Sequence, residues 1–143
     1  MSEWADTAVH GRIAKTDTYD GATNNIVQAN NSDLLLVYTQ NDSAHFSTDG
    51  RVVARLSTDG GLTWSLPNEL HNDPDRDATS PSVVNHPDSD RIDVFDVSFR
   101  VEEPSDETES PERADFHPYR ITSTDHGQIW CEPVQIENHL HTD

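Results

Sequence analysis

Three aspartates alternate along one short stretch of the chain, at Asp73, Asp75 and Asp77. Alternating carboxylates at this spacing open the loops that bind calcium, because a hard cation gathers several oxygen ligands around it. Ala78 replaces the glycine that such a loop needs, however, and no glutamate stands at its twelfth position. The spacing makes calcium a candidate ligand, but these departures favour a loop that holds no metal or other cofactor.

A cation and a carboxylate, Arg76 and Asp77, stand directly before a run of strand-forming residues. A guanidinium group can hold the carboxylate of a ligand through two parallel hydrogen bonds. The two residues are therefore candidates for substrate binding. An ion pair between them is the simpler interpretation.

Imidazole groups supply two further candidates. His45 lies close to Asp42 in a polar stretch and could act as a base beside it, although an exposed loop histidine is the simpler interpretation. His139 and His141 alternate near Asp143, a spacing that presents two imidazoles to a metal from one side of a strand. Their place at the end of the sequence favours a frayed tail over a metal site.

The elements that must position these residues are marked by a repeated turn. Ser57 to Trp64 and Ser123 to Trp130 both read S-x-D-x-G-x-x-W, and each follows an alternating apolar run. Asp-x-Gly favours a hairpin turn, because glycine takes the positive φ and a short carboxylate accepts bonds from turn amides. The tryptophan is then placed to pack beside the turn. The shared positions are Ser57, Asp59, Gly61 and Trp64 in the first turn, and Ser123, Asp125, Gly127 and Trp130 in the second.

The apolar pattern predicts strands in the same order before and after a polar linker, and no helical period appears. The near-continuous apolar run at 33–38 is typical of a strand that is covered on both faces. The first unit has expected strands at 25–28, 33–38, 52–56 and 64–70. The second unit has expected strands at 81–84, 91–99, 119–122 and 129–136.

In a meander of four antiparallel strands, alternate connections lie on opposite edges of the sheet. Both repeated turns should therefore lie on the edge opposite loop 40–50, linker 71–80 and the acidic loop 101–116. A ligand held by those three segments cannot touch the turns. We expect the turns to be structural and the acidic loop to be a solvated insertion.

The repeated turn resembles the Asp box, or BNR repeat, of the sialidase (neuraminidase) superfamily. The resemblance implies an all-β fold, with two four-stranded antiparallel blades of a partial six-bladed sialidase-type β-propeller. It places blade one at about 23–70 and blade two at about 80–137, after an N-terminal segment 1–22. Because so few blades rarely bury a sufficient core, we expect the remaining blades or self-association to close it.

The resemblance also implies an exo-glycosidase chemistry in which a tyrosine attacks the sugar. Sialidases grip the substrate carboxylate with three arginines, pair the tyrosine with a glutamate, and use an aspartate as acid and base. Asp42 matches the region of that aspartate. Where the first family arginine stands, residues 22–27 contain none, and the later arginines and the tyrosine belong to blades beyond this sequence.

We therefore expect a sialidase-like propeller portion that is incomplete for catalysis on its own. The alternative is a non-catalytic Asp-box module that serves as a scaffold for binding a glycan, another carbohydrate or a protein. The missing arginine favours this alternative, whereas the family resemblance favours a glycoside hydrolase.

Acidic residues dominate the composition. The 27 aspartates and glutamates outnumber the 9 lysines and arginines and give a net charge of -18. This balance disfavours nucleic-acid backbones and anionic membranes, which bind clustered cations. The apolar residues are gathered into strands rather than thinned evenly, so we expect a folded domain whose acidic surface suits high salt, where charge repulsion is screened.

The sequence contains one cysteine, Cys131, which excludes an internal disulfide. Its place beside Trp130 favours a buried structural thiol over a nucleophile. No apolar run reaches the length of a membrane span, and the first residues do not form a signal-peptide pattern. A cytoplasmic location is the default expectation.

Overall fold

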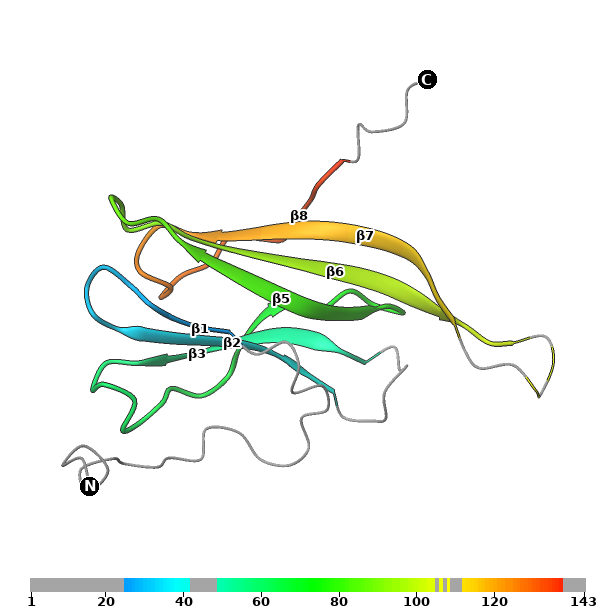
Figure 1. Cartoon of the computed structure of the whole chain (residues 1–143), viewed down its shortest axis with the longest axis horizontal. Coiled ribbons are helices and arrows are strands. Elements are labelled where there is room, and N and C mark those ends of the chain that lie inside the picture. Colours follow the sequence, from blue (N-terminus) through cyan, green and yellow to red (C-terminus); the bar gives the residue numbers. More distant parts are fainter. Residues whose placement is uncertain (1–24, 42–48, 105, 107, 109–111, 138–143) are drawn as a thin grey trace, which may run out of the picture.

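The structure, a computed structural model, describes residues 25–41, 49–104, 106, 108 and 112–137, and in these segments it contains β-strands and no helix (Figure 1). Four strands form an antiparallel sheet in the order β1-β2-β3-β4, and four form a second in the order β5-β6-β7-β8. The expected all-β fold with two four-stranded antiparallel sheets is confirmed. The strands are β1 (Asn25–Gln28), β2 (Leu34–Gln40), β3 (Arg51–Ser57), β4 (Asn68–His71), β5 (Asp77–Asn85), β6 (Ile92–Glu102), β7 (Glu112–Ser123) and β8 (Val134–Gln135).

β2 is buried on both faces, as its continuous apolar run predicts. Leu35 and Val37 join a core that includes residues of the second sheet. Leu36 and Tyr38 alternate with them and form a smaller cluster on the other face. Trp64 of the first repeated turn packs against this smaller cluster.

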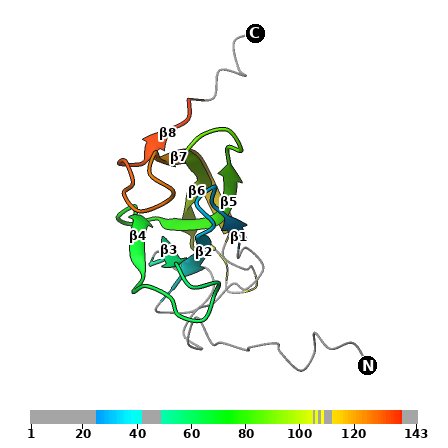
Figure 2. The same cartoon turned by 90° about the vertical axis from the view of Figure 1, so that its left-hand side faces the viewer.

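The main hydrophobic core lies between the two sheets. Leu35 and Val37 meet Ile92, Val94 and Ile121 there, and all five side chains are fully buried. β5 packs against β1, β2 and β3. Figure 2 shows β1 and β5 on one side of the pair and β4 and β8 on the other. Since each such side chain contributes about 1.5–3 kcal/mol when buried, this shared core holds the sheets together.

Asparagine side chains connect the two sheets through β1 and β5, the first strand of each sheet. Asn25 Nδ2 donates to the carbonyl of Pro81 at 2.6 Å, and Asn85 Nδ2 donates to the carbonyl of Gln28 at 3.0 Å. These bonds satisfy backbone carbonyls that the ladder leaves open at the sheet edges. They fix the register of one sheet against the other.

β6 and β7 extend beyond their predicted ends. Pairing continues from Arg100 opposite Ala114 to Glu102 opposite Glu112, so both ends of the stretch expected to be an acidic loop are strands of a long hairpin. The guanidinium of Arg113 lies over the Phe99 ring, 4.7 Å from its centroid. This cation–π contact across the hairpin supports strand pairing that the acidic composition did not predict.

The strands after both repeated turns are shorter than predicted. β4 begins at Asn68 instead of residue 64, and β8 begins at Val134 instead of residue 129. Pro67 precedes one strand and Pro133 precedes the other. Proline has no N–H to donate to a ladder, which delays the pairing in both places.

β5 begins earlier than predicted, at Asp77 in the expected linker. Its pairing with β6 shifts between Thr79 and Ser82, and Ser80 adopts a positive φ of 57°. This irregularity lets Pro81 lie inside a strand, because a bulge interrupts the ladder where proline cannot donate. The described residues contain no helix long and apolar enough to cross a membrane.

Candidate functional site

The connections between strands lie at two opposite edges of the sheets. The linker between β4 and β5 (72–76) and the far end of the β6–β7 hairpin lie at one edge (Figure 1). The two repeated turns and the β1–β2 and β5–β6 connections lie at the other. The strand order separates the turns from the far end of the hairpin, as the sequence predicts. The expectation that a ligand held by the linker cannot touch the turns is wrong, because Asn72 of the linker and Gln128 to Trp130 of the second turn line one cavity, described below.

The first repeated turn is closed by its own side chains. Ser57 Oγ donates to Asp59 Oδ1 at 2.8 Å and accepts from the Gly61 amide at 2.9 Å. The Thr63 amide donates to Asp59 Oδ1 at 2.9 Å, and Trp64 Nε1 donates to the Gly61 carbonyl at 3.2 Å. Because these groups bond inside the turn, they are engaged as a structural role requires.

The second repeated turn has the same internal bonds. Ser123 Oγ donates to Asp125 Oδ1 at 2.8 Å and accepts from the Gly127 amide at 2.9 Å. Asp125 Oδ1 accepts from the Ile129 amide at 2.9 Å, and Trp130 Nε1 donates to the Gly127 carbonyl at 3.0 Å. The sequence repeat is therefore also a repeat of hydrogen-bond geometry.

Arg76 lies at the linker edge, with only 6% of the residue exposed. Its Nε donates to Ser98 Oγ at 3.1 Å, and its Nη1 donates to Asp115 Oδ2 at 2.8 Å. Asp73 Oδ2 accepts from Ser98 Oγ at 2.7 Å and lies 3.4 Å from Arg76 Nε. Nη2 donates to the backbone carbonyl of Asp115. The guanidinium thus joins the linker to β6 and β7.

Asp115 collects positive charge around this network. The Arg76 guanidinium, which donates to its carboxylate, is the main cause that lowers the pKa of Asp115, and His117 adds to the effect. His117 Nε2 lies 3.0 Å from Asp115 Oδ1, and Arg100 Nε lies 3.7 Å from Asp115 Oδ2. The carboxylate stays ionised and holds three basic groups at this edge of the second sheet.

A buried histidine–carboxylate pair lies between the sheets. His71 Nδ1, on β4, is 2.6 Å from Asp96 Oδ2, on β6, and the Asp96 side chain is fully buried. Burial raises the pKa of Asp96, and the His71 hydrogen bond opposes that rise. The His71 ring lies 4.4 Å from the Tyr119 ring, and burial raises the pKa of the Tyr119 hydroxyl, which bonds to Ser98. Since Ser98 bonds to both Tyr119 and Arg76, it connects the His71–Asp96 pair to Arg76 through Tyr119.

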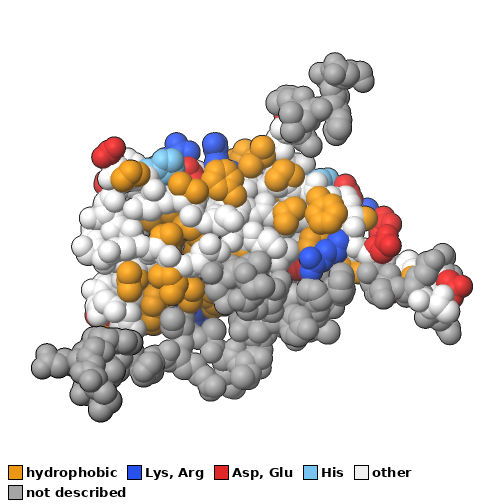
Figure 3. All heavy atoms as spheres, viewed as in Figure 1, with side chains coloured by type: hydrophobic (Ala, Val, Ile, Leu, Met, Phe, Trp, Pro, Cys, Tyr) orange, Lys and Arg blue, Asp and Glu red, His pale blue; other side chains and the backbone are white. Residues whose placement is uncertain are grey.

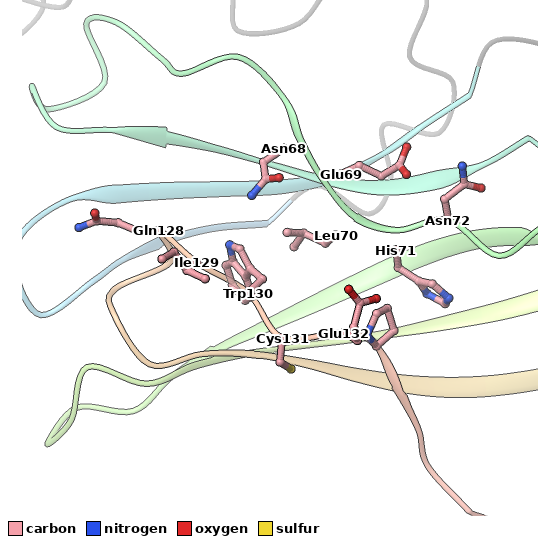
Figure 4. A pocket seen from close by; sticks show the side chains of 11 residues that line it. Asn68, Glu69, Leu70, His71, Asn72, Gln128, Ile129, Trp130, Cys131 and Glu132 are labelled. Carbon is pink, nitrogen blue, oxygen red and sulfur yellow. The ribbon is translucent and has the colours of Figure 1, made fainter.

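A cavity of about 490 Å³ opens beside His71, between β4 and a segment made of the end of the second turn and the residues that follow it. Figure 4 shows the Trp130 ring beside Leu70, with the Glu132 carboxylate turned toward β4. The lining residues are Asn68, Glu69, Leu70, His71, Asn72, Gln128, Ile129, Trp130, Cys131, Glu132 and Pro133. The cavity combines amides, carboxylates and one imidazole with an indole ring.

Two groups of predicted site residues lie outside the described segments. Asp42 and His45 belong to 42–48, and His139, His141 and Asp143 belong to 138–143. An acid–base role for Asp42 and a metal role for the histidines stay predictions.

The predicted calcium aspartates lie in different environments. Asp73 binds Ser98 and Arg76, Asp75 is exposed, and the buried Asp77 carboxylate lies against Gly50. Within the described segments no three histidine, cysteine, aspartate or glutamate side chains gather as metal ligands would. The alternation along the sequence therefore does not become a cluster in space.

Arg76 and Asp77 do not have the same partners. Arg76 forms ion pairs with Asp73 and Asp115, whereas Asp77 faces the start of β3. Substrate binding by either residue stays a prediction.

Sequence reasoning missed His71, Asp96, Ser98 and Asp115. One signal was present, because Asp96 takes an inward position of an alternating strand, where a carboxylate must find a partner. The others come from segments whose approach depends on the packing of the two sheets.

The expectation of a buried thiol at Cys131 is wrong, since Cys131 is exposed. It follows the second turn outside any strand, and its sulfur accepts a hydrogen bond from the Thr122 amide at 3.1 Å. β8 begins only after Pro133, and the Cys131 side chain lies at the cavity.

Solved structures resemble this arrangement of two sheets. The chain is similar to Hadza microbial sialidase Hz136, with 19% identity and a TM-score of 0.62, over 79% of this chain and 25% of that one. It is also similar to a protein of unknown function from Dyadobacter fermentans DSM 18053, with 18% identity and a TM-score of 0.63, over 85% of this chain and 38% of that one. No protein-family model and no curated protein matches the chain.

The likeness is one of fold. At these identities, the two structures show that the sheets pack as they do in a sialidase, and nothing about shared chemistry. The chain spans about a quarter of the sialidase and under two fifths of the other protein.

Proposed function

We propose that the chain forms two consecutive Asp-box blades of a sialidase-like β-propeller. The observation that carries this proposal is the repeated turn, which keeps the same serine, aspartate, glycine and tryptophan bonds in both sheets. The likeness to a sialidase structure supports it independently. In this proposal the six-bladed propeller is completed by further blades.

The outer face of the second sheet supports the need for a neighbour. Val84, Val134 and Ile136 are 43%, 53% and 40% exposed. Figure 3 shows hydrophobic side chains interspersed with basic ones along the upper surface, over β7 and β8. Isolated apolar residues are ordinary on a surface, but exposed apolar side chains at both edge strands of one sheet fit a sheet that another sheet covers.

Association tests this part of the proposal. If the chain is produced alone, a second copy should cover the open face, and size-exclusion chromatography with light scattering should show a dimer or a larger species. A monomer whose far-UV spectrum is that of a folded β protein would contradict the need for further blades or self-association.

Within such a propeller, the two blades supply a scaffold for glycoside chemistry. Asp42 is the proposed acid and base, and Arg76 and Asp77 are proposed contacts for the substrate. Arg76 already donates to Ser98 and Asp115, which leaves its guanidinium little capacity to grip a substrate carboxylate as well. We therefore propose that the chain does not hydrolyse sialosides on its own.

A fluorogenic sialoside tests the catalytic proposal. The purified chain, assayed in dilute and molar KCl, should give no turnover above that of the Asp42→Ala variant. Hydrolysis that Asp42→Ala abolishes would overturn this result and make the chain an enzyme by itself.

The second candidate function is a non-catalytic module that binds a carbohydrate or a protein. The observation that favours it is the internal engagement of Arg76 at the edge where a catalytic arginine would have to be free. Binding of a carbohydrate or a protein by the isolated chain would support this candidate, because the first candidate predicts only the absence of hydrolysis.

A further inference from the structure

The cavity beside His71 lies between the first and second sheets, and described residues of both line it. One wall is the edge strand β4 with Asn72, and the other is the segment 128–133, which holds the end of the second turn and the residues after it. Its volume of about 490 Å³ falls in the range of small-molecule sites. No further blade is needed to form it.

Its polar lining suits hydroxyl groups. The amides of Asn68, Asn72 and Gln128 can both donate and accept hydrogen bonds, whereas the carboxylates of Glu69 and Glu132 accept only. A ligand hydroxyl donates one bond and accepts others, so it can pair with both kinds of group. All five of these residues are exposed.

The floor of the cavity is apolar. Leu70 is buried, and Trp130 is half-buried with its Nε1 committed to the Gly127 carbonyl at 3.0 Å. The bond fixes the indole, which stands beside Leu70 in Figure 4. A rigid aromatic surface beside convergent polar groups matches a ligand with one C–H-rich face and hydroxyls around its rim.

His71 adds an oriented imidazole. Asp96 is fully buried and holds His71 Nδ1 at 2.6 Å. When Nδ1 carries the proton that it donates to Asp96, Nε2 is left as an acceptor for a hydroxyl.

The charge of the lining selects among ligands. Two carboxylates and no lysine or arginine are among the described residues that line the cavity. Glu69 is already paired with Arg51, whose Nε lies 3.8 Å from its carboxylate, so Glu132 is the carboxylate that would repel an anionic sugar. The three side-chain amides pair with hydroxyl groups and need no charge on the ligand.

We propose that the cavity between β4 and residues 128–133 binds an uncharged saccharide unit. This site is separate from the edge that carries Arg76, so the proposal deepens the carbohydrate-binding function without depending on hydrolysis. Sialic acid is excluded from the cavity by its carboxylate.

Cys131 provides a local readout, because it is the single cysteine of the chain, is exposed and lines the cavity. The rate of its modification by a thiol reagent can be measured with neutral mono- and disaccharides, with glucosamine and with sialic acid. A bound neutral sugar should slow the modification about tenfold at ten times its dissociation constant. Sialic acid should not slow it.

Variants of the lining test whether the protection comes from binding there. Asn68→Ala should weaken binding of the protecting sugar about tenfold, the loss of one good hydrogen bond, and Glu132→Gln should weaken it severalfold, because an amide oxygen accepts a weaker bond than a carboxylate does. Glu112→Gln, an exposed glutamate at the other end of β7, is the matched control and should have no effect. Far-UV circular dichroism of each variant should match that of the parent chain.

Three outcomes would overturn the proposal. These are the absence of protection by every neutral sugar, protection by glucosamine alone, which would make this an amine site, and protection that Glu132→Gln and Asn68→Ala leave unchanged. Sialoside hydrolysis is measured in a separate assay, and neither result of that assay affects the cavity proposal.

Discussion

The two repeated turns share their internal bonds but differ in what they pack against. Trp64 packs on the small cluster of Leu36, Tyr38 and Val53, which belongs to its own sheet. Trp130 instead packs against the main core between the sheets. The second turn also places Gly127 close to Leu35 of the first sheet.

This difference separates two roles that the sequence pattern merges. The hydrogen bonds of each turn close a hairpin, and the tryptophan side chain attaches that hairpin to whatever lies beside it. The second turn therefore connects the two sheets, whereas the first turn packs on the outer face of its own sheet. Variants at matched positions can measure the contribution of the contact between sheets.

The largest effect is expected at the tryptophans. Trp130→Ala should reduce the free energy of unfolding by about 3 kcal/mol, because it opens the core between the sheets. Trp64→Ala should cost about 2 kcal/mol, since the smaller cluster can collapse more readily. Chemical denaturation followed by circular dichroism in molar KCl measures both values. Equal losses would show that the contact between the sheets adds nothing.

The glycines should show a smaller difference. Gly61 and Gly127 both have positive φ, at 91° and 88°, so alanine strains either turn by about 1–2 kcal/mol. A Cβ on Gly127 would lie 3.3 Å from Leu35 Cδ1, whereas a Cβ on Gly61 would lie 3.5 Å from Leu34 Cδ1. We expect Gly127→Ala to lower the melting temperature further than Gly61→Ala. The reverse order would mean that Leu35 moves aside freely.

The smallest difference is expected between Asp59 and Asp125, and it should be visible only at acidic pH. Hydrogen bonds from Thr63, first from its side chain and then from its backbone amide, lower the pKa of Asp59 from 3.8 to about 2. In the second turn the matching residue is Ile129, which has no hydroxyl, and its backbone amide is the main cause that lowers the pKa of Asp125. Thr63→Val should therefore raise the pKa of Asp59, as carboxyl chemical shifts in an NMR titration would show.

The sign of the pH dependence follows from the lowered pKa. The ionised Asp59 supports the fold fully above 3.8, its ordinary value, and this support is lost as the pH falls toward about 2. Thr63→Val should raise the lower limit of this pH range, so that the support from Asp59 is lost at a higher pH. Thr58→Val, in the same turn, is the control. An unchanged titration of Asp59 in Thr63→Val would contradict the role of the hydroxyl.

Much of the fold follows from local sequence signals. The alternating run at 91–99 and the continuous run at 33–38 each give the right strand, and the repeated turns give the order of the others. These signals succeed because each is written in neighbouring residues. The pairing of Arg100–Glu102 with 112–114 was not predicted, since the contact between Arg113 and Phe99 joins residues that are distant along the chain.

The polar network was harder to predict for the same reason. Arg76 is recognisable as a cation before a strand, but its partners Ser98 and Asp115 reach it only after β6 and β7 have paired and the sheets have packed. His71 gave no sequence signal, because Asp96 becomes its partner only across the interface between the sheets.

The close approach of Gly50 and Asp77 has a consequence for how related sequences can vary. A Cβ built on Gly50 would lie 1.6 Å from the Asp77 carboxylate oxygen, and the Ala78 amide donates to the Gly50 carbonyl at 3.0 Å. A side chain at position 50 therefore requires that the Asp77 carboxylate turn aside or be replaced by something smaller. Across homologues these two positions should change together, and in the laboratory a side chain introduced at position 50 should cost less stability after Asp77 has been shortened than before.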